Sequence, residues 1–325
     1  MKMMKNIGKE AEEVILQNIV VGSRASKLAL KQTNWVINEL KKQAVPYTFT
    51  IKEIDTSGDQ RTDIPLTKLG AGGVFLAEIQ EQLMDGTIDF AVHSLKDVPL
   101  AAPCGLAIAS IPIREDHRDA YIANDHISFH DLPSGAVIGT SSLRRAAQLL
   151  AKRPDIQTKW IRGPIDTRLA QLHAGDYDAI ILAVAGMKRL GLDLQHITTY
   201  LPDDHFVPAM GQGALAIECR EDDKTMQEIL QTIYHHETAI AVITERLFLR
   251  AFDEGEQAPI GGYASVKNGV IHLRGMVISM DGQTVLLHET TGTDPSKLAN
   301  DTANALIKEG ALDIIAATNA ELAKK

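Results

Sequence analysis

The sequence predicts an α/β protein with two doubly wound lobes around a cleft and a small α+β third domain. Short apolar segments alternate with amphipathic ones between Ile19 and Ala183. This alternation is typical of sheets that are covered by helices on both faces. Two charged, proline-containing stretches, 112–119 and 201–208, interrupt it. From about Tyr263 the pattern changes to short strands joined by turn dipeptides, which indicates a separate small sheet.

The first lobe begins with a strand, a loop and a helix. Residues 19–21 are apolar, residues 22–26 contain glycine and serine, and residues 28–42 carry apolar side chains at helical spacing. The lobe's further elements are predicted as strands over 48–54, 90–92 and 107–111 and a helix over 74–84.

The second lobe repeats the alternation. Its predicted strands are 136–138, 158–161 and 179–183, and its predicted helices are 143–152 and 167–173. We expect the chain to cross between the lobes at the two interrupting stretches. Gly211 and Gly213 then precede an apolar segment, so we expect a flexible return to the first lobe and relative motion of the lobes. The first lobe is assigned to 1–112 and 213–231, and the second to 117–208.

The third domain is assigned to 236–325. Asn268-Gly269 and Asp281-Gly282 are strong signals for two-residue hairpins. Asp294-Pro295 predicts the start of a helix that runs to Gly310.

The composition limits the kinds of partner. The 325 residues carry a formal net charge of −9, which argues against a nucleic-acid partner because phosphate backbones require a basic surface. Cys104 and Cys219 are the only cysteines and have no metal-like spacing. The N-terminus is too charged for a signal peptide, and the longest apolar run, 179–187, is too short for a bilayer. We therefore expect a cytoplasmic protein without a membrane partner.

Three segments indicate an anion-binding cleft. Gly139 to Arg145 follows a predicted strand and places hydroxyls and guanidiniums at the start of a helix. Segments 91–99 and 161–169 also follow strands and carry basic or hydroxyl side chains. Guanidinium groups bind carboxylates and phosphates through two parallel hydrogen bonds. A small molecule with several negative charges is therefore expected. Adjacent His235 and His236 point in different directions on a helix, so no metal site is predicted.

Four segments resemble the porphobilinogen deaminase (hydroxymethylbilane synthase) family, whose members act in tetrapyrrole and heme biosynthesis. They are His93 to Pro99, Gly139 to Arg145, Tyr177 to Gly186, and Pro208 to Gly213. The resemblance implies two periplasmic-binding-protein-like lobes and a monomeric enzyme. It also implies a dipyrromethane cofactor, held through a thioether by a cysteine of the third domain. This cofactor primes the addition of four porphobilinogen units, each of which loses ammonia.

The resemblance also implies the site residues. Asp97 matches the catalytic aspartate, which can bind pyrrole N–H groups, stabilise a cationic intermediate and assist proton transfer. The alternative is a turn or N-cap role before Pro99. The residues expected to bind the acetate and propionate groups are Arg24, Ser26, Lys96, Thr140, Ser141, Ser142, Arg144, Arg145, Arg162, Arg168 and Arg189. The hydroxyl residues among them are equally well explained as helix caps.

The sequence departs from the family pattern at three positions. Glu256 stands where the family has the cofactor-binding cysteine, Gly72 replaces a lysine, and Pro164 replaces an asparagine. Neither Cys104 nor Cys219 is near Glu256 in the sequence. An ester formed by a glutamate would be reversed easily, so covalent attachment is doubtful. Three functions stay open: a synthase with a non-covalent or transiently esterified primer, a non-catalytic pyrrole or polycarboxylate-binding paralogue, and a transferase with an altered acceptor.

Overall fold

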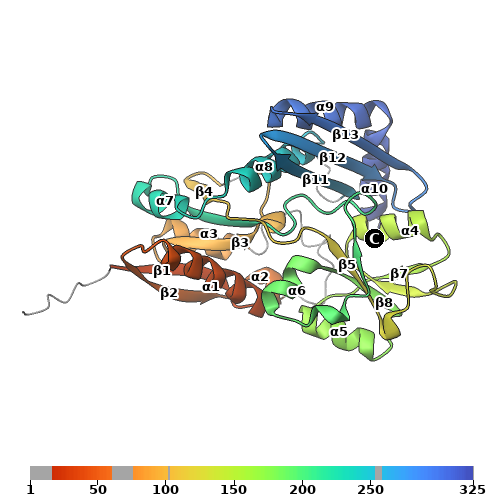
Figure 1. The fold of residues 1–325 in the computed structure, drawn as a ribbon, viewed down its shortest axis with the longest axis horizontal. Coiled ribbons are helices and arrows are strands. Elements are labelled where there is room, and N and C mark those ends of the chain that lie inside the picture. The colour runs from red at the N-terminus through yellow and green to blue at the C-terminus, as the bar shows by residue number, and fades with distance from the viewer. Residues whose placement is uncertain (1–16, 61–75, 102, 253–257, 325) are drawn as a thin grey trace, which may run out of the picture.

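The computed structural model describes residues 17–60, 76–101, 103–252 and 258–324. The expected leader before β1, the Gly72 position and Glu256 lie outside these ranges. Two lobes with one sheet each and a third unit with a smaller sheet make up the described fold (Figure 1). The predicted fold class is confirmed. No helix in the described ranges has the length and apolar character needed to cross a bilayer.

The first lobe is a five-stranded sheet in the order β2-β1-β3-β10-β4. β1 is parallel to both β2 and β3, whereas β10 is antiparallel to its two neighbours. The elements of this lobe are β1 (Gln17–Arg24), α1 (Lys27–Lys42), β2 (Tyr47–Ile54), α2 (Ser57–Gln60), α3 (Ala77–Met84), β3 (Phe90–Ser94), the 3₁₀ turn η2 (Leu95–Asp97), β4 (Leu106–Ser110), β10 (Leu215–Arg220) and α7 (Lys224–Gln231). Because β10 is inserted between β3 and β4, the late return of the chain completes the sheet that carries η2.

The second lobe is a five-stranded sheet in the order β7-β6-β8-β5-β9. Its elements are β5 (Asp119–Ala123), η3 (Asn124–His126), β6 (Val137–Gly139), α4 (Leu143–Lys152), β7 (Gln157–Lys159), α5 (Ile165–His173), β8 (Ala179–Ala183), α6 (Val184–Leu190), η4 (Leu194–His196) and β9 (Thr199–Leu201). The sequence analysis missed β5 and β9. All five residues of β5 are buried, but the strand begins with Asp119 at the end of a charged stretch, so no alternation of apolar and polar residues marks it.

The third unit packs helices against an antiparallel sheet in the order β11-β12-β13. Its elements are α8 (His236–Arg250), β11 (Ile260–Lys267), β12 (Val270–Ile278), β13 (Val285–Gly292), α9 (Pro295–Lys308) and α10 (Ala311–Leu322). Both predicted hairpins are present, but only the first has a two-residue loop: Asn268 and Gly269 have φ values of 53° and 74°, which the tight turn requires. The second was also predicted as a two-residue hairpin, but residues 279–284 separate its paired strand ends, Ile278 and Val285. The side chain of Asp294 caps α9 as expected. The separate helix α10 was not predicted.

The two segments that cross between the lobes run side by side. The Glu115 N–H donates to the Gly213 carbonyl at 3.1 Å. Gly213 has a φ of 88°, and a Cβ atom there would lie 2.4 Å from the Glu115 carbonyl oxygen. Glycine is therefore required at this position both by its backbone angle and by the close approach of the crossing segments.

Candidate active site

A cavity of about 170 Å³ lies between the two lobes. Its apolar wall comes from α1, α5 and the β8–α6 junction. None of the described lining residues is acidic. The polar side chains that line it are Gln32, Ser94, Lys96, Arg145, Arg168, Arg189 and Gln212. The cavity therefore presents four cationic side chains together with neutral hydrogen-bonding groups, a combination that suits a ligand with several carboxylates.

The ends of strands bring these groups together. Ser94 ends β3, and Lys96 lies in η2, which follows it directly. In the second lobe, Arg145 lies in the first turn of α4, just after β6. Arg168 lies in α5, and Arg189 lies in the last turn of α6. Ligands of open α/β sheets bind at the carboxyl ends of strands in the same manner.

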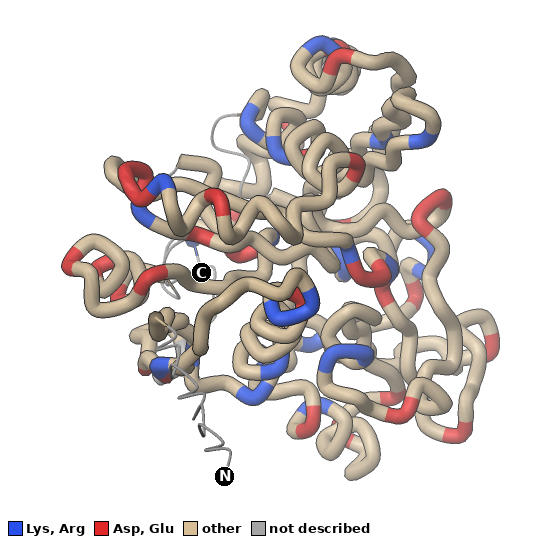
Figure 2. Tube along the Cα trace, turned by 60° about the vertical axis from the view of Figure 1, so that its left-hand side comes forward, with Lys and Arg blue, Asp and Glu red and all other residues tan. Residues whose placement is uncertain are grey.

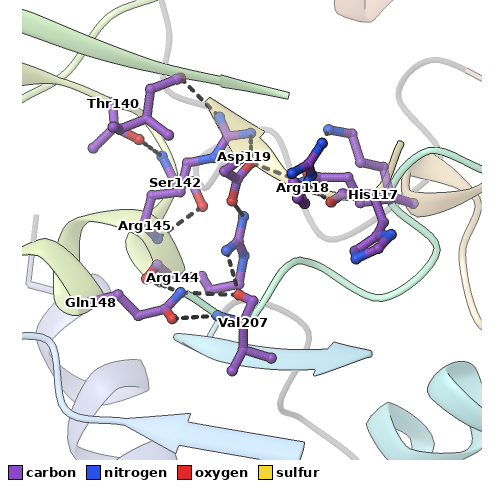
Figure 3. A network of polar contacts seen from close by, with 12 residues as sticks. His117, Arg118, Asp119, Thr140, Ser142, Arg144, Arg145, Gln148 and Val207 are labelled. Atoms are coloured by element: carbon purple, nitrogen blue, oxygen red, sulfur yellow. Dashed lines mark hydrogen bonds and ion pairs between the residues drawn. The ribbon is translucent and has the colours of Figure 1, made fainter. Parts of the chain in front are cut away.

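Asp119 is fully buried at the start of β5 and binds two arginines (Figure 3). Its Oδ2 accepts a hydrogen bond from Arg144 Nη2 at 2.8 Å. Its Oδ1 accepts from Arg145 Nη2 at 2.6 Å and from Arg145 Nε at 3.1 Å. Burial alone would raise the pKa of Asp119, but the two guanidiniums hold it well below its usual range.

Arg144 and Arg145 were expected to act alike, but the structure gives them different surroundings. Arg144 directs its Nη1 to the carbonyl of Val207 at 2.6 Å, and Gln148 binds the same carbonyl at 3.1 Å (Figure 3). Burial lowers the pKa of Arg144 despite the attraction of Asp119. Arg144 thus ties α4 to the segment that leads back to the first lobe, whereas Arg145 lines the cavity.

Gln212 links the cavity to this buried network. Its Nε2 donates to Asp119 Oδ1 at 2.8 Å and to the carbonyl of His117 at 2.8 Å. Its Oε1 accepts from Lys96 Nζ at 3.4 Å. One side chain on the second crossing segment therefore contacts groups from the first lobe, the second lobe and the first crossing segment.

The cavity cations are tuned by their surroundings. The side chain of Lys96 is partly exposed, but loss of water around its ammonium group lowers the pKa of Lys96 to about 8. The negative charge of Asp97 opposes this shift, and the positive charge of Arg145 adds to it. Loss of hydration also lowers the pKa of Arg168 to about 10 and that of Arg189 to about 10. These shifts mark cations that lack full compensation by negative charge, as expected of an anion-binding site.

Asp97 is half-buried in η2, next to Lys96. Two backbone hydrogen bonds fix the turn. The Leu95 N–H donates to the Ala214 carbonyl at 3.0 Å, and the Val98 N–H donates to the Leu95 carbonyl at 3.1 Å. The backbone of Asp97 is therefore held just after β3, on the same turn that brings Lys96 to the cavity.

Several other expected residues have local structural partners. Ser26 caps α1, and Ser142 caps α4, by accepting from the backbone N–H groups of Ala29 and Arg145. Thr140 accepts from the Ser142 N–H, and Ser141 donates to the Ile161 carbonyl. The contacts of Ser26 and Ser142 agree with the helix-cap interpretation, whereas Thr140 and Ser141 bind other backbone groups nearby.

The remaining arginines lie around the cleft. Arg24 ends β1. Arg162 donates to the carbonyl of Gly58, which lies across the cleft in α2, at 3.1 Å. Arg168 and Arg189 donate to the carbonyls of Gly163 and Gly213, each at 2.8 Å. These contacts with neutral carbonyls orient the guanidiniums without cancelling their charge.

Sequence reasoning missed Asp119, Gln212, Arg114 and Glu245. Arg114, on the first crossing segment, pairs with the buried Glu245 of α8 at 2.6 Å and donates to the Gln212 carbonyl at 2.8 Å. The consecutive arginines 144 and 145 were the available signal for Asp119, because two buried guanidiniums require an anion. Gln212 lies in Pro208 to Gly213, one of the four segments that resemble the family, but no role was assigned to its side chain, and nothing in the sequence pointed to Glu245.

His235 has a structural role as the N-cap of α8, where its Nδ1 accepts from the Thr238 N–H. Among the residues that the structure describes, no group of three or more histidine, cysteine or acidic side chains could hold a metal ion. In the view of Figure 2, positions of Lys and Arg are interspersed with positions of Asp and Glu along the described chain.

Two family models match the chain. "Porphobilinogen deaminase, dipyromethane cofactor binding domain" matches residues 19–228, and "Porphobilinogen deaminase, C-terminal domain" matches residues 239–314. The chain belongs to the porphobilinogen deaminase family. The resemblance inferred from the four sequence segments is thereby confirmed.

Relatives are similar over nearly their whole lengths. The porphobilinogen deaminase of Oceanobacillus iheyensis is 51% identical, covering 92% of this chain and 97% of the relative. Those of Bacillus cereus and Geobacillus kaustophilus are 52% and 50% identical, each covering 94% of this chain and 99% of the relative. Among solved structures, a YaeC-family lipoprotein from Enterococcus faecalis is similar with a TM-score of 0.40 and 16% identity, covering 67% of this chain and 90% of that chain.

Replacing Asp119 by asparagine is expected to lower the free energy of unfolding by about 3 to 5 kcal/mol at pH 7, because it leaves two buried guanidiniums without their anion. The wild-type contribution is present above the ordinary pKa of an aspartate and is lost as the pH falls through the lower folded-state value. Urea unfolding at several pH values measures both effects. Asp155→Asn, which removes an exposed partner of Arg153, is the control and should cost far less. Equal losses in the two variants would contradict this account.

Proposed function

We propose that this chain is a transferase that condenses porphobilinogen into hydroxymethylbilane with release of ammonia, a step of tetrapyrrole biosynthesis. The observation that carries the proposal is the interlobe cavity, whose charged lining residues in the described part of the chain are all cationic and which adjoins the turn that holds Asp97. Each pyrrole of the substrate bears an acetate and a propionate group, so its charge complements this lining. The proposal includes action as a cytoplasmic monomer without a nucleic-acid partner.

The donor set also fits a dipyrromethane. Lys96, Arg145, Arg168 and Arg189 would hold its carboxylates, and Gln32 and Ser94 offer neutral hydrogen bonds. Arg24, Arg162 and the hydroxyls of the 140–142 segment complete the proposed carboxylate-binding set. When bound, a dipyrromethane supplies the free pyrrole carbon from which the chain grows.

Asp97 is the proposed proton carrier. As an acid it gives a proton to the amino group of porphobilinogen, so the C–N bond breaks and ammonia leaves while the pyrrole nitrogen supplies the electron pair. The carboxylate then stabilises the resulting cation by accepting a hydrogen bond from the pyrrole N–H. After the new C–C bond forms, the attacking carbon loses its proton, and Asp97 accepts it and returns to its starting state.

We propose that a thioether does not hold the primer in this chain. Glu256 stands at the matched attachment position. Cys219 is fully buried in β10, where burial raises the pKa of its thiol to about 11. Cys104 is exposed, but it lies at the end of β10 that is far from η2. The carbonyl of the next residue, Gly105, accepts from the Glu221 N–H, whereas Leu215 at the other end of β10 pairs with Ser94. Retention of the primer therefore depends on the cations that bind its carboxylates, or on a transient ester at Glu256.

The purified chain is expected to release ammonia and hydroxymethylbilane when given porphobilinogen. Asp97→Ala should reduce the rate by about 100-fold or more, because it removes both proton transfer and stabilisation of the cation. Product formation is measured by absorbance after oxidation to uroporphyrin and by ammonia release. Turnover that persists unchanged in Asp97→Ala would point to a contaminating enzyme. Absent turnover with retained binding of porphobilinogen would favour the non-catalytic paralogue.

The affinity for porphobilinogen is expected to fall as the pH rises through about 8. Lys96 loses its proton in this range, since its pKa is lowered to about 8, whereas Arg168 and Arg189, at about 10, keep theirs. Loss of one charge-assisted hydrogen bond should raise KM about tenfold between pH 7 and pH 9.5. Lys96→Met should have a raised KM with little pH dependence over this interval. A parallel rise in both proteins would assign the effect to another group.

Restoring the cysteine by Glu256→Cys is expected to create a covalent pyrrole adduct that survives acid denaturation, because a thioether is stable where an ester is not. Mass spectrometry of the intact protein after incubation with porphobilinogen measures the adduct. Glu254→Cys places a thiol in the same segment and serves as the control. An adduct on Glu256→Cys but not on Glu254→Cys would support an intact substrate-binding and catalytic site in the rest of the chain. No adduct on either variant would count against the proposed reaction.

A further inference from the structure

Arg246 binds the backbone directly after Asp97, although it lies on α8 in the third unit. Its Nη1 donates to the carbonyl of Val98 at 2.9 Å, and its Nη2 donates to the carbonyl of Pro99 at 2.6 Å. The side chain is half-buried. One planar guanidinium therefore holds two successive carbonyl groups of the segment that leaves η2.

This contact fixes a part of the chain that the sheet does not fix. β3 ends at Ser94, and β4 begins only at Leu106. Pro99 has no N–H group with which to form a ladder hydrogen bond. Two donors in a rigid fork constrain the orientation of both peptide planes more tightly than a single flexible ammonium could. These planes join residues 98–99 and 99–100, so the contact fixes the backbone that leaves η2 directly after Asp97.

The helix that carries Arg246 is itself firmly held. The neighbouring residue, Glu245, is fully buried and accepts from Arg114 at 2.6 Å, from the Gly211 N–H at 2.7 Å and from the Ala264 N–H at 2.8 Å. Both crossing segments and β11 are thus joined to α8 one residue before Arg246. Figure 1 shows α8 running from beside β4 toward the sheet of the third unit.

We propose that Arg246 is a positioning residue for Asp97, through which the third unit sets the orientation of the proton carrier. This inference rests on the proposed function, since it assigns Asp97 the proton-transfer role. Arg246 acts through the backbone of Val98 and Pro99 and not on the substrate. A purely structural contact between the units would affect stability and leave the chemical step of the folded protein unchanged.

The test compares Arg246→Gln and Arg246→Lys with Arg250→Gln, which changes an exposed arginine in the last turn of the same helix. In Arg246→Gln, kcat is expected to fall about 10- to 100-fold with KM changed less than about threefold, because a small misplacement of a catalytic group slows chemistry more than binding. Arg246→Lys, which keeps one donor, should recover part of the loss. Arg250→Gln should match the wild type. Thermal unfolding establishes that each variant is folded at the assay temperature.

Hydrogen exchange gives a readout that does not depend on turnover. The peptide covering 94–100 should exchange faster in Arg246→Gln than in the wild type, while peptides from β12 stay unchanged. Wild-type kcat in folded Arg246→Gln, or unchanged exchange in 94–100, would overturn the inference. If the wild type itself does not turn over, the proposed function fails, and faster exchange confined to 94–100 would still establish that Arg246 orders the segment.

Discussion

The arrangement of the cleft depends on one buried carboxylate, that of Asp119. It accepts hydrogen bonds from two consecutive arginines and from Gln212, so it joins α4, β5 and the second crossing segment at one point. Two guanidiniums in a low-dielectric interior would be very costly without an anion. Because the buried Asp119 carboxylate binds its guanidinium, Arg145 can line the cavity as a cation. The buried ion pair thereby makes a cationic cleft compatible with a folded protein.

A second buried carboxylate, Glu245, has the corresponding role for the third unit. Together the two carboxylates bind both crossing segments, which are the parts that must bend if the lobes move. The contact of Lys27 with Asp166 between the lobes is an exposed ion pair, which costs little to break.

The sequence predicted the elements whose signals are local. The helix over 143–152 and the strand over 179–183 were predicted to the residue, because their apolar spacing and their boundaries coincide. The buried strand β5 was missed because its first residue, Asp119, is charged, and its partners Arg144 and Arg145 come later in the chain. Gln212 contacts Asp119 across 93 residues of sequence, and Arg246 contacts Val98 across 148. Such long-range contacts leave no periodic signal in a single sequence.

The cleft also shows how function opposes stability in this fold. The lowered pKa values of Lys96, Arg168 and Arg189 mean that folding disfavours their charged forms relative to the unfolded chain. At neutral pH these three cations therefore lower the stability of the protein. The proposed polycarboxylate ligand would supply negative charge beside them, raise these pKa values and gain binding affinity in return. A monocarboxylate would compensate fewer of the cations, so we expect the site to favour ligands with several carboxylates.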